Sequence, residues 1–414
     1  MKVCIIGAGP AGMMAGITAR RNGHDVVIIE KNNAVGKKLD ITGKGRCNLT
    51  HSGDNEYFFN NVVTNPKFLM SSINTFNNQD LMQFVNELGV KLKTERGNRV
   101  FLASDNAHEL TLALQRELKR LNANILYDTS VKEVTVRDGQ VTGVITTTGK
   151  NVAADKVIIA TGGVSYPGTG STGDGFDLAK ALGHAIVEPK PALVPLVVYE
   201  EKECKMAEGL ALKNVSLKIK QDGKVTDERF GEALFTANGV SGPIVLSASS
   251  KLTKIENVKE LMQDKRLIIS FDLKPALTNE ELYKRVTRDF DKYKNKEFKN
   301  SLADLLPKSL IPLVIARSEI EETKHVNSIT KEEKTKLVSI LKSLDFCIKS
   351  LGSIYVGIVT SGGVSVKEIN PKTMESKRIS GLYFAGEVID IDAYTGGFNL
   401  QIAFSTGYLA GLNV

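Results

Sequence analysis

The sequence lacks the cysteine spacing and the long apolar runs that mark several classes of protein. Its four cysteines stand far apart and form no Cys-x-x-Cys pair, which argues against a disulfide scaffold, a zinc site and a dithiol redox centre. The five histidines show no metal-ligand spacing, so we predict no metal site. No apolar run approaches the roughly 20 residues that a membrane span needs. The first apolar stretch ends at Gly7, short of a signal-peptide core, so we expect a reducing, cytoplasmic location.

The composition is that of a globular protein with a modest excess of positive charge. Hydrophobic residues make up 42% and charged residues 24% of the 414 residues, which excludes a disordered tail and a collagen-like chain. A net charge of +7 suits a nucleic-acid surface or an anionic ligand. Much of the excess lies between Lys251 and Lys349, interleaved with acidic residues as on a solvated helical face. Because no aromatic-and-basic module accompanies it, we expect a small-molecule substrate and neither a nucleic-acid nor a membrane partner.

The N-terminal segment carries a nucleotide-binding pattern. A short apolar strand leads directly into Gly7-x-Gly9-x-x-Gly12, and a helix and a second strand ending in Glu30 follow. In such a β-α-β unit the three glycines allow a tight turn, close approach of a pyrophosphate and close packing of helix on strand. The helix N-terminus stabilises phosphate charge, and the acid can accept hydrogen bonds from ribose hydroxyls. The pattern therefore predicts an adenine dinucleotide with an unphosphorylated ribose, either FAD or NAD.

The rest of the chain favours FAD. One strand late in the domain ends in a small, Gly-rich turn, and a second nucleotide contact at such a turn is typical of flavoproteins. The last strand ends in a carboxylate that suits a ribityl hydroxyl, and the N-terminus of the final helix can stabilise negative charge on a reduced isoalloxazine. An ordinary β-α turn is the alternative there. The residues concerned are Ala160, Thr161, Gly162, Gly386, Glu387, Gly397 and Phe398.

Two further glycine-rich stretches stand outside the fingerprint. The basic run over residues 36–48 can approach a pyrophosphate and a flavin closely, and its lysines and Arg46 can neutralise phosphate charge. We interpret Cys47 as a packing residue, with a redox thiol as the alternative. Residues 168–173 repeat the Gly-x-Gly-x-x-Gly pattern, but Pro167 and the distance from the preceding strand favour an active-site loop over a nicotinamide-binding domain. NAD(P)H would then be a transient co-substrate without a domain of its own.

Other catalytic side chains are few. Ser241 lacks the Gly-x-Ser-x-Gly pattern of a nucleophile elbow, so a hydrolytic triad is not supported. Among the histidines only His51, just after the basic run, is a candidate acid–base group, and we favour a surface or capping position for it.

Strand and helix signals divide the chain. A β-α-β start and a strand-loop-helix finish indicate one α/β domain that is split by an insertion, so that both ends of the chain close one nucleotide site. We predict a FAD-binding domain over 1–190 and 351–414, an inserted β-rich domain over 191–275 and a helical domain over 276–350. A β-meander is expected over 124–160, with a turn at Asp138-Gly139, and a strand over 355–360.

Long motifs at both ends and in the middle of the chain resemble those of a known family. They are Gly7–Gly12, Gly36–Asn48, Ser165–Gly175, Pro191–Leu196, Leu234–Leu246 and Thr360–Gly411. In them the chain is similar to bacterial FAD flavoproteins that include aminoacetone oxidase and the dienone reductase of bile-acid dehydroxylation. The resemblance implies a Rossmann-like FAD-binding domain, split by an inserted β-barrel-like domain and a small helical domain.

The resemblance also implies a set of FAD ligands. They are Ala11, Glu30, Lys31, Lys38, Thr42, Gly43, Arg46, Asn48, Val131, Gly386, Glu387, Asn399 and Leu400. Pro10, Lys37 and Gly45 lie within the same motifs and complete our candidates.

For activity we expect an FAD-dependent oxidoreductase that reduces a conjugated C=C beside a carbonyl with NAD(P)H. A flavin amine oxidase of the aminoacetone oxidase type is one alternative, and a flavin-carrying RNA-binding protein, suggested by the positive charge, is another. Tyr166 and Asn238 are our candidates to face the substrate. The family usually has a polar residue, often histidine, where this chain has Ala237. That departure removes a candidate acid–base group, so the proton donor and the oligomeric state stay open.

Overall fold

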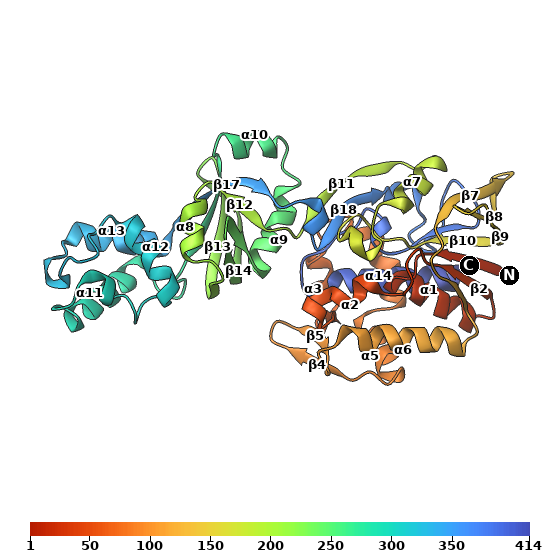
Figure 1. Cartoon of the computed structure of the whole chain (residues 1–414), viewed down its shortest axis with the longest axis horizontal. Helices are drawn as coiled ribbons and strands as arrows, with labels where there is room; N and C mark the ends of the chain where they lie inside the picture. Colours follow the sequence, from red (N-terminus) through yellow and green to blue (C-terminus); the bar gives the residue numbers. More distant parts are fainter. The chain divides into compact units, whose positions relative to one another are not determined.

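The structure, a computed structural model, describes residues 1–414 and divides the chain into two compact units. The first unit comprises Met1–Ala192 and Ile354–Val414, and the second comprises Leu193–Ser353 (Figure 1). Each unit has its own cluster of buried apolar side chains. The first unit is therefore built from both ends of the chain. Both predicted inserted domains fall in the second unit, and the boundary between them stays a prediction.

A five-stranded parallel sheet organises the first unit. Its strand order is β19-β10-β1-β2-β6, and every neighbouring pair is parallel. The strands are β1 (Lys2–Ile6), β2 (Asp25–Ile29), β6 (Asn124–Leu126), β10 (Lys156–Ile159) and β19 (Leu382–Phe384). Val and Ile dominate the inner strands because helices and loops cover both faces of such a sheet. The arrangement confirms the Rossmann-like fold and places a strand from the C-terminal segment beside strands from the N-terminal segment.

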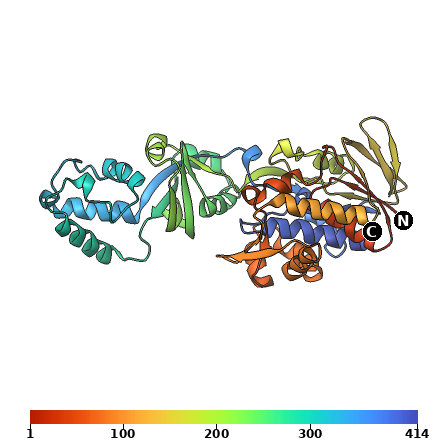
Figure 2. The same ribbon diagram turned by 60° about the horizontal axis from the view of Figure 1, so that its bottom comes forward.

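Two helices from opposite ends of the chain pack closely in this unit. α1 (Pro10–Arg21) contacts both α14 (Phe398–Asn413) and α6 (Ala107–Arg120) (Figure 2). A Cβ at Gly407 of α14 would overlap the carbonyl oxygen of Ala11, so only glycine permits this approach.

The other helices of the first unit are α2 (Lys37–Ile41), α3 (Asn55–Asn60), α4 (Met70–Thr75), α5 (Asn78–Glu87) and α7 (Asp174–Ala181).

Three small antiparallel sheets complete the first unit. They are β7 (Val131–Arg137), β8 (Gln140–Thr146) and β9 (Asn151–Ala153); β3 (Asn48–His51), β5 (Arg99–Leu102) and β4 (Leu92–Glu95); and β11 (Ile186–Ala192) with β18 (Val359–Val364). Asp138 and Gly139 both have positive φ, which confirms the hairpin turn.

Two sequence expectations in this region were wrong. The meander predicted over 124–160 is limited to β7–β9, because β6 and β10 join the parallel sheet instead. The strand predicted over 355–360 begins only at Val359, and Ile354–Val356 forms a single 3₁₀ turn.

The second unit contains the predicted β-barrel and a helical segment. The closed barrel has the order β12-β15-β14-β13-β16-β17. Its strands are β12 (Leu196–Val198), β13 (Ala211–Gln221), β14 (Lys224–Thr236), β15 (Gly239–Ser241), β16 (Leu267–Asp272) and β17 (Leu344–Leu351). The helices are α8 (Glu201–Met206), α9 (Pro243–Leu252), α10 (Val258–Gln263), α11 (Asn279–Lys292), α12 (Ile311–Ser318) and α13 (Lys331–Lys342).

The helical segment of this unit has clear start signals. Thr278 with Glu281 and Thr330 with Glu333 form reciprocal capping boxes at α11 and α13. In neither unit is a helix both long and apolar enough to cross a membrane.

Candidate functional site

The glycine fingerprint forms the turn between β1 and α1. Gly7 has a φ of 102°, and its N–H donates to the Ile29 carbonyl at 2.8 Å. A Cβ at Gly12 would overlap the Gly7 carbonyl oxygen, whereas a Cβ at Gly9 would meet no atom within 4 Å. Gly7 and Gly12 therefore close the turn, and Gly9 faces open space. Pro10 occupies the first turn of α1, where its missing N–H costs no hydrogen bond.

Glu30 lies beside this turn at the end of β2. Its side chain is buried, and one carboxylate oxygen accepts a hydrogen bond from the Ala8 N–H at 2.9 Å. The other oxygen accepts from the backbone and side-chain amides of Asn32 at 2.9 and 2.7 Å. These three donors fix the carboxylate next to the fingerprint, where unused lone pairs suit ribose hydroxyls.

Lys31 and Lys37 make side-chain contacts close to Glu30. The Lys31 ammonium pairs with Asp174 at 2.7 Å and also contacts the Thr172 hydroxyl. The Lys37 ammonium lies 3.4 Å from the Asn32 amide oxygen. Both lysines thus have partners within the protein, and Lys31 ties the end of β2 to the second glycine-rich loop.

Glu387 is the centre of a polar cluster at the carboxyl ends of β10 and β19. Its carboxylate pairs with Lys38 at 2.8 Å and accepts hydrogen bonds from the Thr360 N–H at 2.8 Å and the Ser165 hydroxyl at 3.2 Å. Lys38 also donates to Ser165 at 2.6 Å. The cluster joins four chain segments where ligands bind to open parallel sheets. The sequence identified Lys38 and Glu387, whereas Ser165 and Thr360 carried no signal of their own as polar partners.

The rest of the basic run is held by its own contacts. The Thr42 hydroxyl donates to the Leu39 carbonyl at 2.7 Å, and Gly43 and Gly45 have positive φ. Arg46 stacks on Phe101 and pairs with Glu95 and Asp105, two acids that the sequence analysis did not connect with it. The guanidinium of Arg46 is therefore neutralised within the protein.

The loop before α14 is tied to the basic run. The Asn48 amide lies 3.2 Å from the Gly397 N–H, and its oxygen accepts that hydrogen bond when the amide is oriented to satisfy both of its ends. The Asn399 amide donates to the Ala393 carbonyl at 2.8 Å and accepts from the Ala393 N–H at 3.0 Å. Phe398 is buried, and Leu400 packs against the core. These residues position the N-terminus of α14.

Small residues pack closely where the ends of β10 and β19 meet the fingerprint segment. The Gly386 N–H donates to the Thr406 hydroxyl at 2.9 Å, and a Cβ at Gly386 would lie 2.8 Å from Ala11. Ala160 is buried and Gly162 has a φ of 76°. The Thr161 hydroxyl oxygen between them is buried without a hydrogen-bond partner and lies against Gly175 of α7, where a Cβ would come within 2.0 Å of it. The features of this sheet edge that fit a bound FAD are the open space at Gly9 and the Glu30 carboxylate beside the fingerprint turn.

The candidate adenine contact lies elsewhere in the first unit. Val131 begins β7, and it is half-buried against the core. It therefore stays a prediction based on the resemblance.

The two substrate-facing candidates belong to different units. Tyr166 is 38% exposed, and it has a left-handed backbone with a φ of 53°, which is uncommon for an aromatic residue. Asn238 is exposed at the β14–β15 turn of the barrel, where its carbonyl accepts from the Val198 N–H at 3.1 Å. Both roles stay predictions.

His51 and Cys47 are both buried. The interpretation of His51 as a surface or capping residue was wrong, because its ring is 1% exposed and lies against Tyr57, Phe58 and Phe398. Burial lowers the pKa of His51 to about 4, against a smaller opposing effect of Asp54. Burial also raises the pKa of the Cys47 thiol to about 12, so it stays protonated and packs as the sequence predicted.

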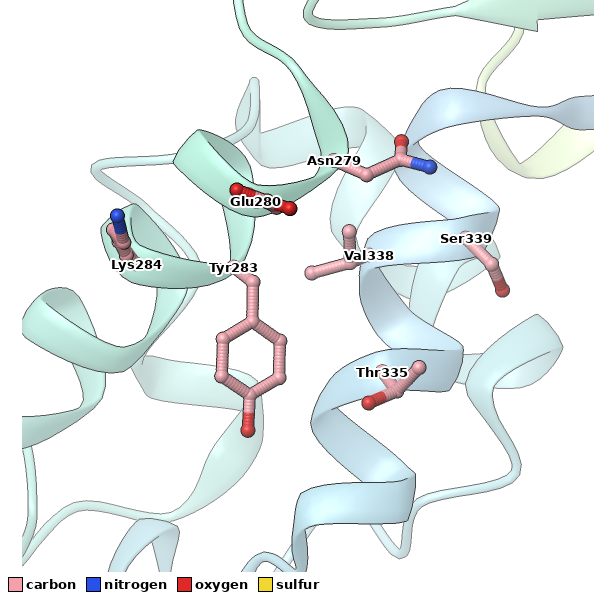
Figure 3. A pocket seen from close by; sticks show the side chains of 7 residues that line it. All are labelled: Asn279, Glu280, Tyr283, Lys284, Thr335, Val338 and Ser339. Atoms are coloured by element: carbon pink, nitrogen blue, oxygen red, sulfur yellow. The ribbon is translucent and has the colours of Figure 1, made fainter.

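The second unit has an open hollow of about 420 Å³ between α11 and α13. Figure 3 shows Tyr283 of α11 turned toward α13, with Val338 opposite it. None of the seven lining residues was predicted as a cofactor ligand: they are Asn279, Glu280, Tyr283, Lys284, Thr335, Val338 and Ser339. No group of three or more His, Cys, Asp or Glu side chains is placed to hold a metal ion.

The fold and the fingerprint site define an FAD-binding oxidoreductase. The chain belongs to the HI0933-like Rossmann-domain family, whose pattern matches residues 1–413. It is 31% identical over 412 residues to the 3-dehydro-bile acid delta(4,6)-reductase of Clostridium scindens, with 99% of this chain and 98% of that protein covered. It is 30% identical to the ribosomal RNA dihydrouridine synthase of Haemophilus influenzae, with 99% of this chain and 97% of that protein covered. The predicted family is confirmed.

Solved structures confirm the fold. The 3-ketosteroid-Δ4-(5α)-dehydrogenase of Rhodococcus jostii superposes with a TM-score of 0.55 at 14% identity, covering 99% of this chain and 96% of that one. The 3-ketosteroid Δ1-dehydrogenase of Sterolibacterium denitrificans gives a TM-score of 0.52 at 11% identity, covering 99% and 98%.

Proposed function

We propose that this FAD-dependent oxidoreductase reduces a carbon–carbon double bond conjugated with a carbonyl group, using NADH or NADPH. The observation that supports this most directly is the chemistry common to two relatives that match almost the whole chain. The Δ4 and Δ6 double bonds of a 3-dehydro-bile acid are conjugated with its 3-carbonyl. Uridine becomes dihydrouridine when the ring double bond conjugated with its carbonyl is saturated. Both named activities therefore add two hydrogens to a polarised C=C.

The site residues have complementary roles in this proposal. FAD, when bound, supplies hydride transfer between a nicotinamide and the electron-poor carbon of the substrate. Glu30 and the open face of Gly9 hold the adenosine and diphosphate end. The ion pair between Lys38 and Glu387 orders the carboxyl ends of β10 and β19 around the ribityl chain. In this proposal Tyr166, the residue after Ser165 of this cluster, faces a substrate carbonyl from the first unit.

A small-molecule enone is the substrate class that we favour. A second candidate is a uridine in ribosomal RNA, because the relatives from Haemophilus influenzae and Escherichia coli, the latter 28% identical over 406 residues, carry that name. The net charge of +7 is compatible with this candidate. An enone and a uridine both present a C=C conjugated with a carbonyl to the flavin. The two candidates therefore differ only in how the protein binds the rest of the substrate.

Steady-state turnover with product analysis tests the proposal. Purified enzyme is incubated with NADH or NADPH and a panel of cyclic and steroidal enones, and products are identified by mass spectrometry. We expect a product that has gained two hydrogens, formed in step with nicotinamide oxidation. Peroxide release from aminoacetone and oxygen without nicotinamide would select the amine oxidase alternative and contradict the proposal. In a parallel arm, undermodified ribosomal RNA replaces the enone, and reduction of a uridine would select the second candidate.

A further inference from the structure

The second glycine-rich loop, residues 162–174, crosses the edge of the parallel sheet. It leaves the end of β10, and its far part contacts Lys31 and Asn32 directly after β2. In the sheet order β1 lies between β10 and β2. The loop must therefore pass over the carboxyl end of β1, where the fingerprint turn lies.

The loop is held at both ends by specific contacts. On the β10 side, the Val164 N–H donates to the Thr360 hydroxyl at 2.9 Å, and the Ser165 hydroxyl donates to Glu387 at 3.2 Å. On the β2 side, the Asn32 amide donates to the Thr169 carbonyl at 3.1 Å, while the same amide holds Glu30. Gly170 packs directly on this amide, since a Cβ there would lie 2.5 Å from the Asn32 nitrogen.

An ion pair closes the contact on the β2 side. Lys31 pairs with Asp174 at 2.7 Å, and the Thr172 hydroxyl contacts Lys31 and donates to Asp174 at 2.6 Å. Burial alone would raise the pKa of Asp174, but the hydrogen bonds from Lys31 and Thr172 outweigh it and hold that pKa below its usual value. The Lys31 and Asp174 side chains are 25% and 45% exposed, so water can reach and break the pair.

We propose that residues 162–174 form a strap over the adenosine and diphosphate half of FAD, latched by Lys31, Thr172 and Asp174. Gly162, Gly170 and Gly173, with φ of 76°, 102° and 90°, are the points where the strap bends. The latch sets how fast FAD leaves, whereas Ser165 and Tyr166 at the start of the segment keep the roles proposed above for the ribityl chain and the substrate. This inference rests on the proposed placement of the adenosine at Glu30.

FAD release tests the strap independently of turnover. Asp174→Asn removes the charge of the latch but keeps the size of the side chain, and Thr172→Val removes the bridging hydroxyl. After dilution of the FAD-loaded protein, the recovery of free-FAD fluorescence gives the rate of release. We expect release about fivefold faster in Asp174→Asn, the upper range for a partly exposed pair, and a smaller increase in Thr172→Val. ADP binding to the apoprotein should weaken in both variants, because ADP carries the half of FAD that the strap covers.

The control is Arg378→Gln, which removes the ion pair between the 52% exposed Arg378 side chain and Glu368 in the same unit. Release from this variant should match the unmodified protein. The strap proposal would be overturned if FAD left all variants at the same rate, or if Arg378→Gln accelerated FAD release as much as Asp174→Asn does. Glu30→Gln is measured alongside: if it changes neither FAD release nor ADP binding, the adenosine placement is wrong, and the strap fails with it. Enone turnover is a separate measurement, so failure of the proposed reaction leaves these results interpretable.

Discussion

At the residue scale, a buried histidine makes the stability of the folded protein depend on pH. His51 ends β3 inside an aromatic cluster, and its Nδ1 has no hydrogen-bond partner. Desolvation lowers its pKa from 6.5 to about 4. The unfolded chain takes up a proton near pH 6.5, whereas the folded protein resists protonation until about pH 4. The unfolded state therefore binds more protons in this window, and stability falls as the pH decreases through it.

We expect the free energy of unfolding to drop by about 2 kcal/mol between pH 7 and pH 5 through His51 alone. Urea unfolding of the unmodified protein and of His51→Gln at both pH values measures this contribution. The variant should lose that part of the pH dependence, although it is less stable at pH 7. His108→Gln is the control, because the His108 side chain is 55% exposed. Equal pH dependence in the unmodified protein and His51→Gln would contradict the burial of a neutral His51.

At the scale of elements, two glycines of the β1–α1 turn are needed for different reasons. Gly12 is needed for packing, because a Cβ would overlap the Gly7 carbonyl oxygen. Gly9 is in open space and has an ordinary φ of −78°, so the apoprotein tolerates a side chain there. In the FAD complex, however, a methyl group at Gly9 would occupy the space through which the diphosphate approaches α1.

The two alanine substitutions should therefore differ. Gly12→Ala is expected to destabilise the apoprotein by about 1–3 kcal/mol and to lose FAD. Gly9→Ala should unfold at the same denaturant concentration as the unmodified apoprotein yet bind FAD at least tenfold more weakly. Denaturant unfolding and FAD titration measure the two effects. Tight FAD binding by Gly9→Ala would show that the diphosphate lies elsewhere.

Elements defined by local pattern could be predicted, and those defined by distant partners could not. β1 and β2 lie where the sequence indicated, because apolar runs there lead into glycine or an acid. β6 and β10 were assigned to a meander because an antiparallel and a parallel strand have the same local pattern when both are short and apolar. The residues of the fingerprint and of the Lys38–Glu387 pair were found from motifs. Ser165 and Thr360 also stand in quoted motifs, but their role as partners of that pair was not predicted, since only the fold brings them together.

At the scale of the whole molecule, two separate apolar cores predict two unfolding events. The buried cluster of the first unit and that of the second share no residue. The candidate FAD ligands all belong to the first unit, and a ligand stabilises only the unit that it binds. Differential scanning calorimetry of the apoprotein should show two transitions, of which added FAD raises only one. A single transition, or two that shift equally, would contradict independent cores.

The barrel also shows which features of the whole molecule the sequence leaves open. β17 closes the barrel between β12 and β16, yet it follows the helical segment α11–α13 in the chain. The sequence indicated the β-rich and helical stretches in order, but a strand that returns after some 70 residues has no local signal.

The central claim is that electrons pass from a nicotinamide through FAD to a conjugated double bond. Anaerobic stopped-flow absorbance of the flavin tests it in two half-reactions without oxygen. The account predicts that NADH or NADPH bleaches the yellow FAD band, and that an enone then restores it in a single turnover while forming the saturated product. Flavin that is bleached by no nicotinamide, or that stays bleached with every enone and uridine substrate yet recovers with oxygen, would contradict it.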